Sequence, residues 1–195
     1  MPEEHPASMV LASGSPRRKQ LLAEAGYRFR VVRPNIDESA LSVGGLSPCE
    51  CAKGRALAKA KNVAARFPDS LVVGADTVVD CEGQVIGKPR DAKEAEEITR
   101  KLFAGPHDVI TAVAIVRLED GIEIVESDTT RVYPRKMTDG QIAEHIKSGS
   151  WREKAGAYAI QEGGDEFIER IEGSLTNVMG LPMELLGGLL GAIVD

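Results

Sequence analysis

The chain has 195 residues, of which 43% are hydrophobic and 28% charged, and its formal net charge is −6. This apolar content suffices for one hydrophobic core, so we expect a single domain over residues 1–195 with a flexible tail at 1–8. The acidic balance argues against a nucleic-acid partner, and the apolar run near the C-terminus is too short to span a membrane. Three cysteines that cannot all pair within the chain suit a reducing compartment, so we expect a cytoplasmic protein.

The first predicted element is a short apolar strand at 9–12, which leads through Ser-Gly-Ser-Pro into a helix. Ser15 is a suitable N-cap, and Pro16 suits the first helical turn. Arg17 and Arg18 then place two positive charges at the positive end of the helix dipole, which is unfavourable unless an anion binds there. The turn therefore predicts either a phosphate site or a solvated basic helix start.

Strand and helix patterns alternate in the first half of the chain. A strand at 29–35 precedes a helix that begins with a capping box at Ser47 and Glu50 and continues to about residue 67. A strand at 71–80 then turns back at 81–84, and a further helix begins at Asp91. This alternation is typical of an α/β fold.

The second half of the chain predicts antiparallel pairing. An Asp-Gly pair at 120–121 separates two β-patterned segments, 109–118 and 122–133, and is a strong hairpin signal. A helix capped by Thr138, a Gly-rich region, a strand-like segment at 167–171 and an apolar helix from about residue 182 follow. Together the two halves predict a mixed β-sheet flanked by helices.

Asp76 interrupts an otherwise apolar strand. A buried carboxylate needs a partner, so Asp76 indicates either a structural salt bridge or a metal ligand or general base beside a cleft. In-register pairing of the hairpin would bring Lys88 near it, whereas Lys59 is one of several basic residues on the second helix. Asp37 and Glu38 form a second acidic cluster, which is either a solvated loop or half of a metal site. One or two carboxylates facing a phosphate cradle form a ligand set that Mg²⁺ favours.

Eight motifs follow one another along nearly the whole chain: LASGSPRR, the acidic pair at 37–38, KAKNVA, GADTVV, IGKPRDA, HDVITAVAI, EKAGAYAIQ and NVMGLP. Their ordered combination resembles the Maf family of nucleoside triphosphate pyrophosphatases. The resemblance implies an α/β fold in which a mixed sheet and its helices form two lobes around a deep cleft, in a homodimer. It also implies hydrolysis of a nucleoside triphosphate to the monophosphate and pyrophosphate with a divalent cation, Mg²⁺, Mn²⁺ or Co²⁺.

The resemblance also implies roles for the matching positions. Asp76 matches the family's proton acceptor, and Glu38 matches the acidic residue that would hold the metal together with Asp76. Which carboxylate acts as base and which as ligand stays open. Lys59 and Lys88 match the family's catalytic lysines. The substrate-binding positions that the resemblance implies are Ser13, Arg17, Arg18, Thr77 and Gln161.

The motifs GADT and KAGAYAIQ resemble the dTTP/UTP branch of the family, in which the positions of Arg17, Thr77 and Gln161 are associated with base selection. A glutamine amide can donate to O4 and accept from N3–H of uracil or thymine, and cytosine reverses this pattern. The chain departs from the branch in carrying Glu153 where an aspartate is common. Two alternatives remain: a Maf pyrophosphatase acting on 7-methyl-GTP or other modified nucleotides, and a non-catalytic nucleotide-binding regulator of cell division or septum formation.

Overall fold

The computed structural model describes residues 9–37, 45–152, 154–158 and 167–194. Its strands are β1 (Met9–Ala12), β2 (Phe29–Val31), β3 (Leu71–Cys81), β4 (Gln84–Ile86), β5 (His107–Arg117), β6 (Ile122–Pro134) and β7 (Ile168–Glu172). They form one mixed sheet in the order β2-β1-β3-β5-β6-β7, with β4 also paired to β3. The β1 strand is parallel to β2 and β3, whereas the other pairs are antiparallel, so the predicted mixed sheet is confirmed.

The helices are α1 (Pro16–Glu24), α2 (Pro48–Ala64), α3 (Ala92–Leu102), α4 (Asp139–Ser148), the 3₁₀ turn η2 (Ala155–Ala157), α5 (Leu175–Met179) and α6 (Met183–Val194). Helices α1, α2, α3 and α4 begin where the capping signals predict. In α2 the Ser47 hydroxyl accepts from the backbone of Glu50, whose carboxylate accepts from the backbone of Ser47. None of the described helices has both the length and the apolar character needed to cross a bilayer.

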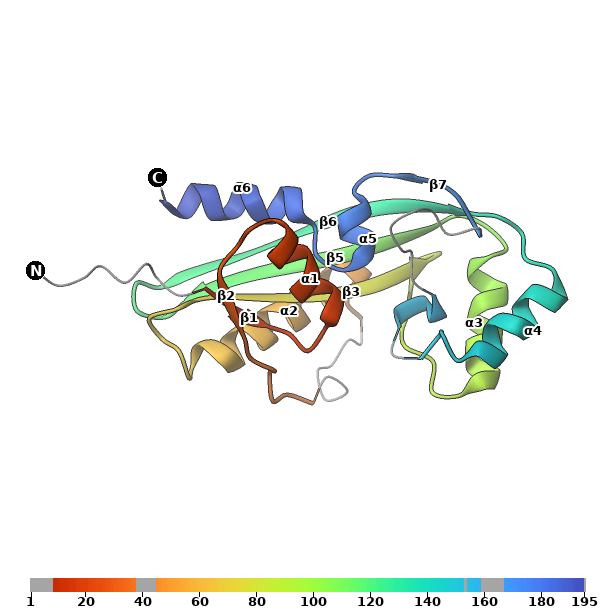
Figure 1. The fold of residues 1–195 in the computed structure, drawn as a ribbon, viewed down its shortest axis with the longest axis horizontal. Helices are drawn as coiled ribbons and strands as arrows, with labels where there is room; N and C mark the ends of the chain where they lie inside the picture. Colours follow the sequence, from red (N-terminus) through yellow and green to blue (C-terminus); the bar gives the residue numbers. More distant parts are fainter. Residues whose placement is uncertain (1–8, 38–44, 153, 159–166, 195) are drawn as a thin grey trace, which may run out of the picture.

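The helices cover the sheet in three groups (Figure 1). Helix α2 packs on one face through small residues such as Ala56 and Ala60. Helices α1, α5 and α6 cover the other face, and α3, α4 and η2 lie at the far end of the long strands. The close approach of α2 requires Gly74, because a Cβ there would lie 2.5 Å from the carbonyl oxygen of Ala56.

A gap in the pairing of β3 determines where a site can form. On one side of β3, the β1 ladder ends at Gly74 opposite Ala12, and the β4 ladder begins at Val79 opposite Ile86. Among the described strands, none pairs with residues 75–78 on that side, although β5 pairs with all of them on the other. The backbone edge of this stretch is therefore not covered by a described strand, although Ala75, Asp76 and Val78 are themselves buried.

Candidate active site

Three side chains meet on the α2 face of this gap. The Lys59 Nζ atom donates to Asp76 Oδ1 at 2.6 Å, and Arg55 Nη1 lies 3.9 Å from Asp76 Oδ2. The Lys59 and Asp76 side chains are each only 7% exposed. Arg55 and Lys59 are four residues apart in α2 and so share one helix face. Asp76 therefore forms a salt bridge, one of the two alternatives that the sequence offered, and the guanidinium of Arg55 lies beside it.

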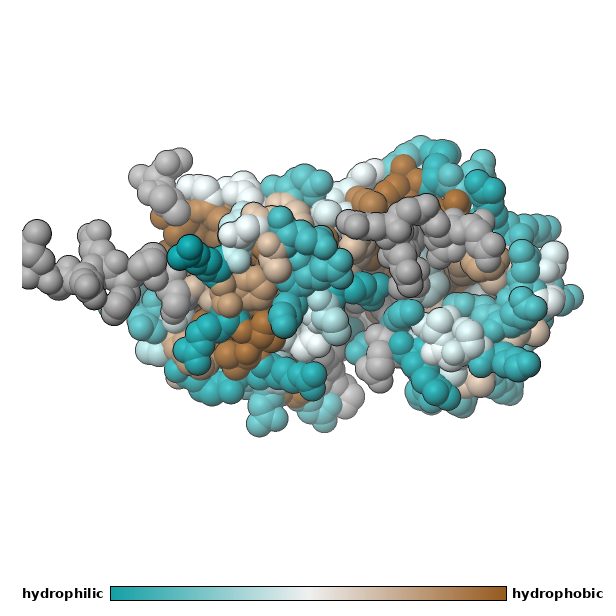
Figure 2. Space-filling view, viewed as in Figure 1, coloured by the Kyte–Doolittle hydropathy of each residue, from teal (hydrophilic) through white to brown (hydrophobic). Residues whose placement is uncertain are grey.

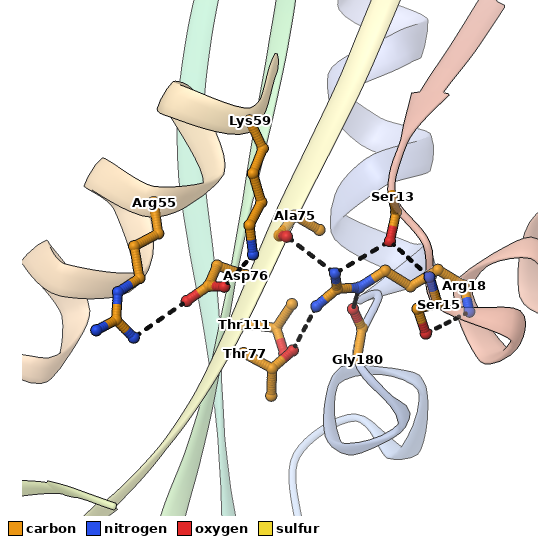
Figure 3. A network of polar contacts seen from close by, with 10 residues as sticks. All are labelled: Ser13, Ser15, Arg18, Arg55, Lys59, Ala75, Asp76, Thr77, Thr111 and Gly180. Carbon is orange, nitrogen blue, oxygen red and sulfur yellow. Dashed lines mark hydrogen bonds and ion pairs between the residues drawn. The ribbon is translucent and has the colours of Figure 1, made fainter. Parts of the chain in front are cut away.

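The opposite face of the gap is held by Arg18. Its guanidinium donates to Gly180 O at 2.7 Å, to Ala75 O at 2.9 Å, to Thr77 Oγ1 at 3.1 Å and to Ser13 Oγ at 3.3 Å. Figure 3 shows this cluster on one side of β3 and the Asp76 cluster on the other. Arg18 therefore satisfies a carbonyl of the open strand edge and joins the first turn of α1 to the residue after α5.

The hydroxyl of Thr77 is committed within the protein. Thr111 Oγ1 donates to the Asn177 carbonyl at 2.9 Å and lies 2.9 Å from Thr77 Oγ1. Because the Thr111 proton is used, Thr77 must donate to Thr111 while it accepts from Arg18. Thr77 thus keeps acceptor capacity toward a ligand but has no proton to donate.

Arg17 has a different environment from its neighbour Arg18. It is half-buried and lines the cavity described below, and no described side chain forms an ion pair or hydrogen bond with it. Burial lowers the pKa of its guanidinium, which shows that the charge is partly desolvated. An anion bound beside Arg17 would offset that desolvation.

A cavity of about 1280 Å³ connects these clusters. Eight basic side chains and one acidic side chain, Asp76, are among the described residues that line it, in a chain whose net charge is −6. Its polar part is strongly electropositive and suits a polyphosphate, whereas Val109, Tyr158 and Met179 add apolar surface suited to a planar ring. Figure 2 shows the molecule narrowing between its two ends, with mainly hydrophilic residues on the visible surface. The eight basic residues are Arg17, Arg18, Arg33, Arg55, Lys59, Lys88, Arg152 and Lys154.

The structure brings most of the predicted site residues to this one cavity. Ser13, Arg17, Arg18, Lys59, Asp76, Thr77 and Lys88 all line it. Glu38 and Gln161 lie outside the described residues, so their predicted roles stay predictions. Sequence reasoning missed Arg33, Arg55 and Arg152. The spacing of Arg55, one helical turn before Lys59, is the signal that would have identified it.

The turn at 154–158 forms one wall of the cavity. Gly156 has φ 71° and donates its backbone N–H to Gly87 O at 3.1 Å, next to Lys88. A Cβ at Gly156 would lie 2.9 Å from Val79 Cγ2, so glycine is required twice over. The turn thereby ties the motif AGAY to the loop that carries a predicted catalytic lysine.

Two histidines form hydrogen bonds with residues of the same turn. His145 Nε2 lies 2.8 Å from Ala157 O, and His107 Nε2 lies 2.5 Å from the Tyr158 hydroxyl. His107 Nδ1 lies 3.2 Å from Leu102 O, so Nδ1 carries the proton and Nε2 accepts from the tyrosine. Burial lowers the pKa of His107, which keeps the imidazole neutral near pH 7.

The site fits a divalent cation that is shared with a phosphate. Asp76 Oδ2 is buried and has no hydrogen-bond partner among the described residues. Nowhere among the described residues does a group of three or more histidine, cysteine, aspartate or glutamate side chains lie so that it could hold a metal ion alone. One carboxylate oxygen supplemented by phosphate oxygens is a normal arrangement for Mg²⁺.

Comparison with known proteins identifies the family. A family model described as Maf-like protein matches residues 8–193. The chain belongs to the Maf family. Relatives in the Maf family include a protein of Geotalea uraniireducens (strain Rf4), 43% identical over 96% of this chain and 97% of the relative. Others are from Elusimicrobium minutum (strain Pei191), 43% identical over 93% and 96%, and Rhodopirellula baltica (strain DSM 10527 / NCIMB 13988 / SH1), 42% identical over 95% and 82%. All three are named dTTP/UTP pyrophosphatase.

Proposed function

We propose that this Maf-family chain is a nucleoside triphosphate pyrophosphatase that hydrolyses dTTP and UTP to the monophosphate and pyrophosphate. The observation that carries the proposal is the cavity lined by eight basic side chains together with the buried Asp76. Relatives that are 42–43% identical over at least 93% of the chain carry the name dTTP/UTP pyrophosphatase. A cavity with this charge in an acidic protein suits a triphosphate better than any neutral metabolite.

The reaction is attack of water on the α-phosphorus, with pyrophosphate as the leaving group. Lys59 holds Asp76 through Oδ1 and leaves Oδ2 without a hydrogen bond, so that this oxygen can accept a proton from the attacking water. Arg17 and Lys88 line the cavity, where their positive charges can stabilise the negative charge that develops on the departing pyrophosphate. Arg18 keeps the first turn of α1 and Ser13 in place for phosphate binding.

We propose that Asp76 and Glu38 hold a divalent cation, Mg²⁺, Mn²⁺ or Co²⁺. The support for this proposal is the buried Oδ2 atom of Asp76, which makes no hydrogen bond to the described residues, together with the metal requirement that the family resemblance implies. When bound, such a cation neutralises phosphate charge and lowers the pKa of a coordinated water. The residues of the chain then orient the substrate around it.

For base selection we propose Gln161 together with Thr77 and Arg17, the last two of which line the cavity. The support from geometry is the apolar wall formed by Tyr158 and its neighbours, beside which Thr77 offers an acceptor only. A glutamine amide provides the donor and acceptor pair that uracil and thymine require. A homodimer and a cytoplasmic location complete the proposal, the latter consistent with the free thiols of Cys49, Cys51 and Cys81.

The test is a panel of nucleoside triphosphates, including CTP and 7-methyl-GTP, incubated with Mg²⁺, Mn²⁺ or Co²⁺. We expect UTP and dTTP to give the monophosphate and pyrophosphate with the highest kcat/KM. A preference for CTP or 7-methyl-GTP would overturn the assignment to the dTTP/UTP branch but not the assignment as a pyrophosphatase. Binding of nucleotide without turnover under every condition would instead identify a regulator.

A further inference from the structure

Arg55 lines the cavity and has a buried guanidinium nitrogen that makes no hydrogen bond within the part of the chain that the structure describes. The Arg55 Nε atom is buried, and within the described residues it has no acceptor and the guanidinium forms one ion pair, the 3.9 Å contact of Nη1 with Asp76 Oδ2. That distance exceeds the length of a hydrogen bond. By contrast, the guanidinium of Arg18 makes four hydrogen bonds to the described residues alone. Buried donors without acceptors are rare, and each needs an explanation.

The surroundings of Arg55 specify what its missing partner must be. Lys59 holds Asp76 through Oδ1, and in this position the other oxygen, Oδ2, stays 3.9 Å from Arg55 Nη1, beyond hydrogen-bond distance. The Arg55 side chain is 22% exposed and its exposed part faces the cavity. The partner is therefore an acceptor that enters the cavity beside Asp76. A guanidinium with its five donors in a plane matches the oxygens of a phosphate.

We propose that Arg55 binds the α-phosphoryl group of the nucleotide, next to the carboxylate that activates water. The inference rests on the proposed function, because it takes Asp76 to mark the position of the reacting phosphorus. Arg55 then neutralises the charge on the non-bridging oxygens of the α-phosphoryl group, while Arg17 and Lys88 bind the pyrophosphate portion. Arg55 is in this respect a catalytic residue that none of the recognised motifs contains.

The experiment compares Arg55→Met with Lys61→Met. Both substitutions remove one positive charge from α2, but Lys61 is 49% exposed and pairs with Glu123 outside the cavity. The probe is the α,β-methylene analogue of UTP, which cannot be cleaved, and its Kd is measured by calorimetry with Mg²⁺ present. Inorganic pyrophosphate is titrated as the second ligand. The melting temperature of each variant is recorded without ligand, and kcat for UTP is measured separately.

In Arg55→Met we expect the Kd of the analogue to rise at least about tenfold, since charged hydrogen bonds to phosphate are lost. The Kd of pyrophosphate should stay within about twofold, and kcat should fall by more than the Kd rises, because the contact strengthens as charge develops. The melting temperature should not decrease, because a buried unpaired donor is removed. Lys61→Met should match the wild type in every measurement.

Three results would overturn the proposal while leaving the pyrophosphatase intact, provided that the wild type cleaves UTP. Unchanged affinity for the analogue would show that Arg55 does not bind the nucleotide. An equal loss of affinity for the analogue and for pyrophosphate would show that Arg55 binds the pyrophosphate portion and not the α-phosphoryl group. If Arg55→Met does not fold, Arg55→Lys serves instead, and full retention of kcat in that variant would exclude the planar contact. A wild type that cleaves no triphosphate overturns the proposed function itself.

Discussion

The buried pair of Lys59 and Asp76 is the feature whose two contributions, to stability and to turnover, can be separated by experiment. Removing one partner of a buried ion pair costs about 3–5 kcal/mol, because the remaining charge is left without compensation. In Lys59→Met the nearby Arg55, 3.9 Å from the carboxylate, offsets part of that cost. We therefore expect the low end of the range, about 3 kcal/mol, which lowers the Tm of a chain of this size by about 6–12 °C.

The double variant Lys59→Met/Asp76→Asn distinguishes the contributions. It removes both charges, so urea unfolding should show recovery of at least about 1 kcal/mol relative to Lys59→Met, the sign of a coupled pair. Turnover should not recover, because Asp76→Asn alone removes a proton acceptor and is expected to lower kcat by about 10²–10⁴-fold. Pyrophosphate release from UTP is the assay. A double variant that regains activity would refute the assignment of Asp76 as base, and additive stabilities would refute the coupling.

Further predictions concern the other parts of the site. Arg18→Ala should lower the free energy of unfolding, measured in urea, by about 2 kcal/mol, because its guanidinium is hydrogen-bonded to backbone carbonyls. Arg17→Ala should instead weaken nucleotide affinity and leave the free energy of unfolding unchanged. A native pKa of His107 below the unfolded value means that stability decreases as the pH falls below about 6.5, and His107→Gln should remove that part of the slope in pH-dependent unfolding. Gly156→Ala should destabilise the protein by about 1–3 kcal/mol in thermal denaturation, because it introduces both an unfavourable φ and a clash. Gln161→Ala should narrow the ratio of kcat/KM for UTP and CTP by about tenfold or more, and an unchanged ratio would exclude Gln161 as the base reader.

Local signals in the sequence predicted the elements well, because caps and turns depend on neighbouring residues. The capping boxes at Ser47 and Thr138 begin helices as predicted, and the turn after Cys81 has Glu82 and Gly83 at positive φ, as a tight hairpin requires. Helix α5 was not predicted. Its five residues are too few to show a helical period, and the helix depends on the buried Asn177 side chain, which bonds to β5.

The composition of the site was less accessible to sequence reasoning. The motifs identified Asp76 and Lys88, but they gave no indication that Arg18 is consumed by backbone carbonyls from segments more than fifty residues away. That arrangement depends on where β1 ends relative to β3, a matter of sheet register. The role of Arg55 was likewise hidden, because its neighbour Asp76 is brought to it only by packing of α2 on the sheet.

The unpaired stretch of β3 has a consequence for how this enzyme can diverge. Successive residues of a strand point to opposite faces, so Asp76 reaches the layer under α2 while Thr77 reaches the layer under α5. In the proposed mechanism, the water-activating Asp76 and the base-selecting Thr77 are thus anchored in two different packing layers. If Thr77 selects the base as proposed, substitutions beneath α5 should change which nucleotide is accepted without altering the contact between Lys59 and Asp76. We expect directed evolution of new substrate preference to accumulate changes on one side of the sheet.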